Sequence, residues 1–104
     1  MEQSSTGVDT KLRKPPIKIL IVEDDTDFIF LIQKLLGQYE TIQIAGICQE
    51  KEKAVDMALK CQPDLVLMDL DLGSSFSDGI EISREIRILT EAKVLILTAL
   101  DSPD

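Results

Sequence analysis

Acidic residues stand directly after two apolar runs of this sequence. Glu23 and Asp24 follow the first run, and Asp69 follows the second, with Asp71 two positions further on. Carboxylates brought within about 4 Å of one another repel by ~4 kcal/mol at an effective dielectric constant of about 20. Such a cluster stays ionised only with a cation, and hard oxygen ligands select magnesium, manganese or calcium. Because a carboxylate can also attack phosphorus and form an acyl phosphate, the pattern indicates metal-assisted phosphoryl transfer.

The apolar runs predict strands that position these acids. The run that begins at Leu65 and ends in Asp69 is continuous, which is typical of a parallel strand buried on both faces at the centre of a sheet. Further strands are expected at 17–22, 42–47 and 93–97, the last running into Thr98 and Ala99. Helical spacing of apolar residues predicts helices from Thr26 to about Gln38 and from about Glu50 to Cys61, and a third, capped by Asp78, to about Leu89.

Strands and helices alternate strictly along the chain, which predicts an α/β fold with a parallel sheet and right-handed crossovers. All strand carboxyl ends then lie along one edge of the sheet, where open α/β sheets bind their ligands. Glu23, Asp24, Asp69 and Thr98 are expected at that edge, and the Thr98 hydroxyl could hydrogen-bond a transferring phosphoryl oxygen.

Composition excludes several other classes of function. The 104 residues suit one domain, and a net charge of -8 argues against a nucleic-acid surface on this segment. There is no His, and the two cysteines, Cys48 and Cys61, do not form a Cys-x-x-Cys pair, so a His/Cys zinc site is not expected. Both cysteines are expected to be buried reduced thiols. No apolar run is long enough to span a membrane or resembles a signal peptide, so the expected location is the cytoplasm, without membrane contact.

Residues 1–16 are polar, lack periodicity and end in Pro15 and Pro16, so we expect a disordered tail before the domain.

Four motifs resemble the receiver domain of two-component response regulators. They read ILIVEDD, PDLVLMDL, DGIE and VLILTA in chain order, and the resemblance covers residues 17–104. It implies a flavodoxin-like doubly wound sheet with the strand order 2-1-3-4. It also implies a phosphorelay function, in which a sensor histidine kinase or phosphotransfer protein supplies the phosphoryl group from a phosphohistidine. The implied output is transcription regulation, and a homodimer is a further implied partner.

The resemblance implies a role for each residue of the site. Asp69 would be the phosphoacceptor and Thr98 the switch hydroxyl. The Mg²⁺ ligands, which could equally hold Mn²⁺, would be Asp69 with Asp24 directly, Glu23 mainly through water, and Asp71 through its backbone carbonyl. Asp25 is expected to cap the first helix instead of binding the metal. The domain is not expected to be an enzyme beyond phosphorylating itself and slowly losing the group.

The sequence departs from the family in two places. Gly73 stands where the family usually has proline, and the loop from Gly73 to Asp78 is longer than usual. The chain also ends before the usual fourth helix, fifth strand and fifth helix, so the lysine of the fifth strand is missing. We interpret the domain as C-terminally incomplete, a fragment of a longer regulator or else a naturally short receiver. The fourth strand would then be an open, aggregation-prone edge.

Two other functions stay open. Asp69 and Asp71 after a buried strand would also suit an aspartyl-nucleophile phosphatase, although those enzymes have Thr or Val where this chain has Gly73. A remodelled receiver could act only as an interaction module. A calcium loop beginning at Asp69 fails, because its twelfth position is Ile80 and not Glu.

Overall fold

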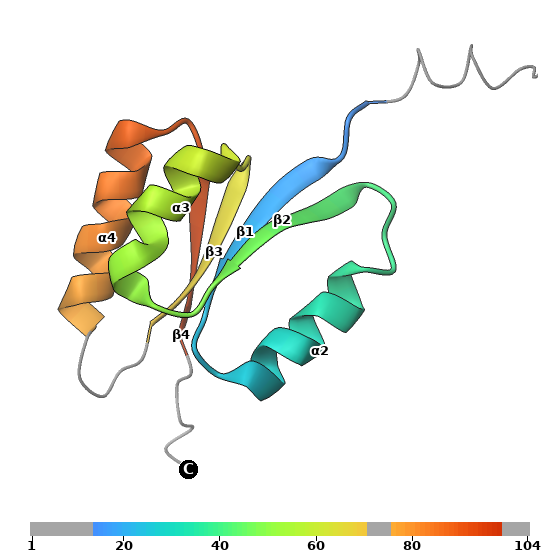
Figure 1. The fold of residues 1–104 in the computed structure, drawn as a ribbon, viewed down its shortest axis with the longest axis horizontal. Coiled ribbons are helices and arrows are strands. Elements are labelled where there is room, and N and C mark those ends of the chain that lie inside the picture. Colours follow the sequence, from blue (N-terminus) through green and yellow to red (C-terminus); the bar gives the residue numbers. More distant parts are fainter. Residues whose placement is uncertain (1–13, 71–75, 99–104) are drawn as a thin grey trace, which may run out of the picture.

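One parallel sheet of four strands forms the centre of the chain (Figure 1). The computed structural model describes residues 14–70 and 76–98, the side chains of 76, 77 and 98 excepted. The strands are β1 (Ile17–Val22), β2 (Ile42–Cys48), β3 (Leu65–Leu70) and β4 (Lys93–Thr98), and they lie in the order β2-β1-β3-β4. Every neighbouring pair is parallel. The predicted α/β class, strand order and central place of the third strand are confirmed.

Helices connect the strands in the expected alternation. These are α2 (Thr26–Leu36), the short 3₁₀ turn η1 (Lys51–Lys53) with α3 (Ala54–Cys61), and α4 (Phe76–Leu89). In Figure 1, α3 and α4 lie together on one side of the sheet, and α2 lies apart from them beside β2. None of the helices in the described ranges is long and apolar enough to cross a bilayer.

The face of the sheet under α3 and α4 holds the main core. Because strand side chains alternate between faces, one set of alternate residues from β1 and β3 points to this side. These residues pack with small side chains of α3 and with Ile86 of α4, and each fully buried Leu or Val contributes roughly 1.5–3 kcal/mol. The cluster includes Leu20, Val22, Val66, Met68, Leu70, Ala54, Ala58 and Ile86.

The opposite face is less completely covered, which corrects one expectation. The third strand was predicted to be buried on both faces, yet Leu65, Leu67 and Asp69 are only half-buried. The reason is the position of α2, which packs chiefly against β2 and leaves this part of β3 partly open. Ile29 of α2 is buried.

Three helix boundaries differ from those predicted. The first helix ends at Leu36, before the expected Gln38. The second begins as a 3₁₀ turn, and regular α-helix starts only at Ala54. The third begins at Phe76, so Asp78 lies within its first turn and is not the predicted cap. Its negative charge there interacts favourably with the helix dipole.

The tail and the fourth strand stand as follows. Lys14, Pro15 and Pro16 are exposed and lie outside any helix or strand, and residues 1–13 of the expected tail lie outside the described residues.

Within the described part, β4 is an edge strand of the sheet, and its Leu95 and Ile96 are 49% and 37% exposed. Aggregation through this exposed apolar edge stays a prediction.

Asp64 joins three strands at the opposite, amino-terminal end of the sheet. Its backbone N–H donates to the Lys18 carbonyl oxygen at 2.8 Å, and its carbonyl oxygen accepts the Lys93 N–H at 3.0 Å. Its carboxylate Oδ2 also accepts the Lys18 N–H at 2.8 Å. One residue thus fixes the starts of β1 and β4 on either side of β3.

Replacing Asp64 should measure the contribution of this carboxylate. Asp64→Ala removes the acceptor for the Lys18 N–H and should lower the free energy of unfolding by about 1 kcal/mol. Asp64→Asn keeps an acceptor oxygen and should lower it less. Urea unfolding of both variants tests this, and equal losses would contradict a role for the side-chain hydrogen bond.

Candidate functional site

The carboxyl ends of β1 and β3 lie side by side. Val22 is opposite Met68 in the β1–β3 pairing, so the residues that follow them, Glu23 and Asp69, emerge next to each other. Asp69 is in turn opposite Leu97 of β4. The parallel register therefore places these acids at one edge, as the order of motifs predicted.

Glu23 is the buried member of this group. Glu23 is only 5% exposed, and its backbone N–H donates to the Cys48 carbonyl oxygen at 2.8 Å. Oε2 accepts the Asp25 N–H at 2.9 Å. Oε1 is buried and has no hydrogen-bond partner within the described part of the chain. A buried, unpartnered carboxylate oxygen is costly, so this atom calls for a proton or a cation.

The same surroundings change how Glu23 titrates. The pKa of Glu23 is raised from its ordinary 4.5 to about 7, chiefly by burial and next by the adjacent Asp69 carboxyl through contact and like charge. The Asp25 N–H opposes this shift by stabilising the carboxylate, and the Asp24 charge adds a smaller upward contribution. Burial and like charge thus both favour the protonated form of Glu23, which persists to near neutral pH.

Asp24 and Asp25 are exposed and differ in role. Asp25 is the N-cap of α2, where its Oδ1 accepts the Asp27 N–H at 2.9 Å and the Phe28 N–H at 3.3 Å. This confirms the predicted cap. Asp24 makes no such cap and is close enough to Glu23 to influence its charge. Asp24 is thus exposed beside Glu23 and is not engaged in the Asp25 cap.

A recess of about 10 Å³ lies between the two strand ends and α2. Apolar side chains surround it, so the enclosed Glu23 carboxyl is poorly solvated. The lining is Ile21, Val22, Glu23, Phe28, Ile32, Leu67, Asp69 and Leu97. Phe28 and Leu97 were not predicted as site residues. Their signal in the sequence is position alone, since each falls close to a strand end that carries a site residue.

Comparison with known proteins places this geometry in a family. The family model of the response regulator receiver domain matches residues 19–104. The chain belongs to this family. Sporulation initiation phosphotransferase F of Bacillus subtilis strain 168 is 36% identical over 85 residues, which are 79% of this chain and 64% of that protein.

A second relative is much longer than this receiver. The protein-glutamate methylesterase/protein-glutamine glutaminase of the group 1 operon from Pseudomonas putida strain KT2440 is 31% identical over 84 residues, or 81% of this chain. The receiver matches 22% of that protein, about a fifth of its length. It also spans less than two thirds of the phosphotransferase, of which it covers 64%.

Solved receiver structures share the fold. The receiver domain of the response regulator NarL from Mycobacterium tuberculosis superposes with a TM-score of 0.74 at 19% identity, covering 86% of this chain and 72% of that one. The N-terminal domain of a response regulator/sensory box/GGDEF protein from Carboxydothermus hydrogenoformans has a TM-score of 0.66 at 35% identity, covering 83% and 67%. The order β2-β1-β3-β4 is thus the receiver arrangement.

The expected metal ligands of the receiver are only partly described. Glu23 and Asp69 lie together with Asp24 nearby, whereas Asp71 falls outside the described residues. Within residues 14–70 and 76–98, no group of three or more acidic, Cys or His side chains is arranged to hold a metal. The donors present still fit a hard cation, because Glu23 Oε1 is a buried oxygen without a partner beside a second carboxylate.

The remaining predicted residues stand as follows. Thr98 is the last residue of β4, opposite Leu70, and its side chain lies outside the described part. Gly73 and Ala99 also lie outside it. Both cysteines are free; Cys48 is buried as expected, whereas Cys61 is only half-buried.

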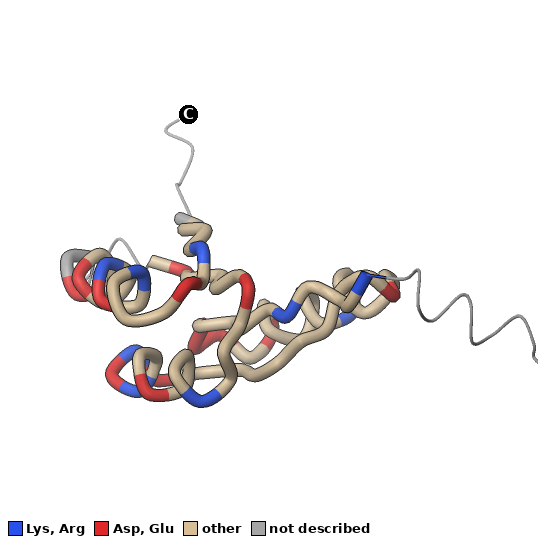
Figure 2. The backbone as a smooth tube through the Cα atoms, turned by 90° about the horizontal axis from the view of Figure 1, so that it is seen from above, with Lys and Arg blue, Asp and Glu red and all other residues tan. Residues whose placement is uncertain are grey.

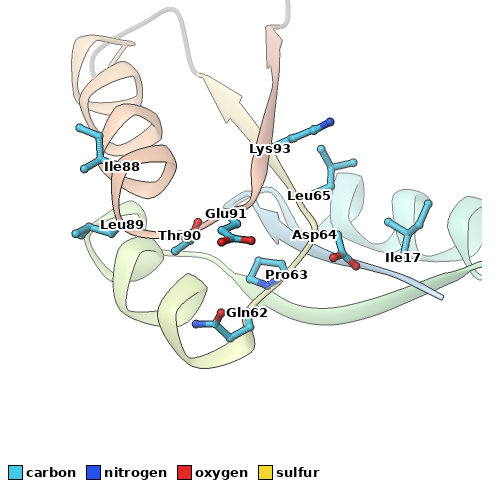
Figure 3. Close-up of a pocket in the computed structure, with 10 residues that line it drawn as sticks. All are labelled: Ile17, Gln62, Pro63, Asp64, Leu65, Ile88, Leu89, Thr90, Glu91 and Lys93. Atoms are coloured by element: carbon cyan, nitrogen blue, oxygen red, sulfur yellow. The ribbon is translucent and has the colours of Figure 1, made fainter. Parts of the chain in front are cut away.

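Charge and cavities elsewhere do not compete with this edge as a chemical site. Figure 2 shows acidic and basic positions interspersed on α3 and α4. A larger cavity, of about 1010 Å³, opens at the other end of the sheet, near Ile17, Asp64 and Lys93 (Figure 3). Ile88 on its border is 73% exposed, so the cavity is a wide, solvated hollow. Of the two acids in its lining, Asp64 accepts the Lys18 backbone N–H and Glu91 is exposed.

Stability of the metal-free receiver should depend on the Glu23 proton. Because the folded pKa of about 7 exceeds the ordinary 4.5, the folded state binds more protons in this interval, so stability should fall as pH rises from about 5 to about 8. The loss should be as much as about 3 kcal/mol. Urea unfolding in EDTA measures it.

Glu23→Gln is the control for this pH dependence. The amide cannot ionise, so the variant should lose the part of the slope that Glu23 causes and should exceed the wild type in stability above pH 7. Parallel profiles of the two proteins would contradict the assignment.

Proposed function

We propose that this chain is a phospho-accepting receiver of a two-component phosphorelay, with Asp69 as the acceptor. The observation that carries the proposal is the pairing of Asp69 with the buried Glu23, whose Oε1 has no partner in the described part of the chain. The family supports the same function. The proposed donor is a phosphohistidine on a sensor histidine kinase or phosphotransfer protein, and the proposed setting is the cytoplasm.

Asp69 suits nucleophilic attack for two structural reasons. It lies in β3, whose backbone is held by β1 on one side and β4 on the other, so the carboxylate is presented from a rigid element. It is also only half-buried, which leaves it open to a donor, whereas Glu23 next to it is enclosed. The two acids therefore have different proposed roles. Asp69 is the nucleophile, and the carboxyl group of Glu23 determines the charge beside it.

The transfer step balances as follows. A carboxylate oxygen of Asp69 attacks phosphorus and forms an O–P bond, while the N–P bond of the phosphohistidine breaks and its electron pair stays on the imidazole nitrogen. The product is an aspartyl phosphate, with no net oxidation or reduction. The proposed role of Thr98 is to donate its hydroxyl to a phosphoryl oxygen from the adjacent strand end. Phosphorylation would then switch a downstream output, for which we propose transcription regulation.

Mg²⁺, or Mn²⁺ in its place, is the cofactor that these acids would hold. The proposed ligands are Asp24 and Asp69, with Glu23 through water and Asp71 through its backbone carbonyl. When bound, the ion would neutralise charge on the carboxylates and on the phosphoryl oxygens. The ion would also stabilise the charged form of the enclosed Glu23, which burial disfavours.

Phosphorylation can be tested by intact mass. Incubated with Mg²⁺ and a small phosphodonor such as acetyl phosphate, the wild type should gain one phosphoryl group and Asp69→Asn should gain none. Asp64→Asn makes the same change of charge at the other end of the same strand, so it should be phosphorylated like the wild type. A modified Asp69→Asn protein would overturn the acceptor assignment.

Metal binding can be tested by stability. A ligand at a hundredfold excess over its Kd stabilises the folded state by about 2.7 kcal/mol, so Mg²⁺ should raise the unfolding midpoint of the wild type. Asp24→Asn and Glu23→Gln should lose most of that gain. Asp27→Asn, a change at a nearby exposed acid in the first turn of α2, should keep it. Equal responses of all four proteins would contradict the proposed ligands.

An aspartyl-nucleophile phosphatase and a pure interaction module are the alternatives. Turnover of p-nitrophenyl phosphate at enzymatic rates would favour the phosphatase, because the proposed receiver loses its phosphoryl group slowly. Kinase binding without any phosphorylation would favour the interaction module.

A further inference from the structure

Gly79 lies on the buried side of α4, against the end of β3. A Cβ atom at this position would collide with Cδ2 of Leu70 and would lie 3.5 Å from its Cγ. The helix backbone therefore packs directly on the residue that follows Asp69. Figure 1 shows the start of α4 near the carboxyl end of β3, the end that carries Asp69.

Backbone conformation does not explain this glycine. None of the glycines in the described part of the chain has a positive φ, so alanine would fit the backbone of Gly79. Alanine would also favour the helix, because glycine inside a helix costs about 1 kcal/mol relative to alanine. The remaining reason for glycine is space, since any side chain would meet Leu70.

Leu70 has little room to move away. It is 1% exposed and belongs to the core cluster, where close packing leaves few alternative positions for a side chain. Its backbone is opposite Thr98 of β4, and Asp69 immediately precedes it. A displacement of Leu70 would therefore also displace the ends of β3 and β4, which carry the proposed acceptor Asp69 and the proposed switch residue Thr98.

We infer that Gly79 is a positioning residue for Asp69. Its missing side chain lets α4 lie against Leu70 and so fixes the end of β3 at the place where the acceptor carboxylate meets Glu23. The consequence for phosphoryl transfer rests on the proposed function, whereas the consequence for the position of Asp69 does not.

Gly79→Ala tests this inference with Leu70→Val as its partner. Valine lacks the δ carbons and so removes the atom that the new methyl group would meet. Gly79→Ala should slow phosphorylation of Asp69 by acetyl phosphate about tenfold or more, since small displacements of reacting groups cost that much. Gly79→Ala with Leu70→Val should return to within about twofold of the Leu70→Val rate. Glu81→Ala, an exposed change on the same helix, should match the wild type.

Phosphorylation rates and backbone resonances together distinguish an effect on the position of Asp69 from an effect on stability and from a failure of the proposed function. All rates are measured well below each variant's unfolding midpoint. The ¹⁵N–¹H resonances of Asp69 and Thr98 are followed in parallel: they should shift in Gly79→Ala, return toward the Leu70→Val positions in the double variant, and stay in place in Glu81→Ala.

Each result then decides one claim. If Gly79→Ala lowers only the unfolding midpoint while rate and resonances stay as in the wild type, the positioning role is overturned. A failure of Leu70→Val to rescue would overturn the Leu70 contact as its route. If the wild type takes no phosphoryl group, the proposed function fails, and the resonances alone decide the position of Asp69.

Discussion

Two carboxyl groups, those of Glu23 and Asp69, lie beside each other at the ends of paired parallel strands, and one of them is almost fully enclosed. This arrangement is unfavourable without a compensating proton or cation, because burial and like charge both oppose ionisation. It persists because the β1–β3 register fixes the backbone on both sides. The sheet thus stabilises an arrangement that the two side chains alone would avoid, and such strain is typical of functional sites.

The rest of the fold holds that pair in place. The main core lies under α3 and α4, where alternate residues of β1 and β3 are fully buried. The acids point toward the less covered side, shared with α2, where Asp69 is reachable. At the far end Asp64, next to β3, makes two hydrogen bonds to Lys18 of β1 and one to Lys93 of β4, so these strands are also held at that end.

Most of this arrangement could be predicted from the sequence, because it depends on strand order and on period. Apolar runs ending in Glu23 and Asp69 gave the strands, and alternation with helices gave the parallel sheet. The cap at Asp25 was also predictable, since an acid before an amphipathic run is a strong local signal. These features are local or topological, and neither needs the shape of any side chain.

Packing between distant residues could not be predicted in the same way. One face of β3 is half-buried because of the position of α2, and a continuous apolar run in the sequence does not predict that position. The start of α4 before Asp78 and the contact of Gly79 with Leu70 depend on how a helix settles on a strand end. The roles of Asp71 and Thr98 stay predictions from the family resemblance.

In the proposed function, Asp69 carries the phosphoryl group. Borohydride reduces an aspartyl phosphate to homoserine, so treating the phosphorylated protein and sequencing its peptides by tandem mass spectrometry locates the acceptor directly. We expect homoserine in place of Asp69 and unmodified Glu23, Asp24 and Asp64. Homoserine at another aspartate, with Asp69 intact, would contradict it.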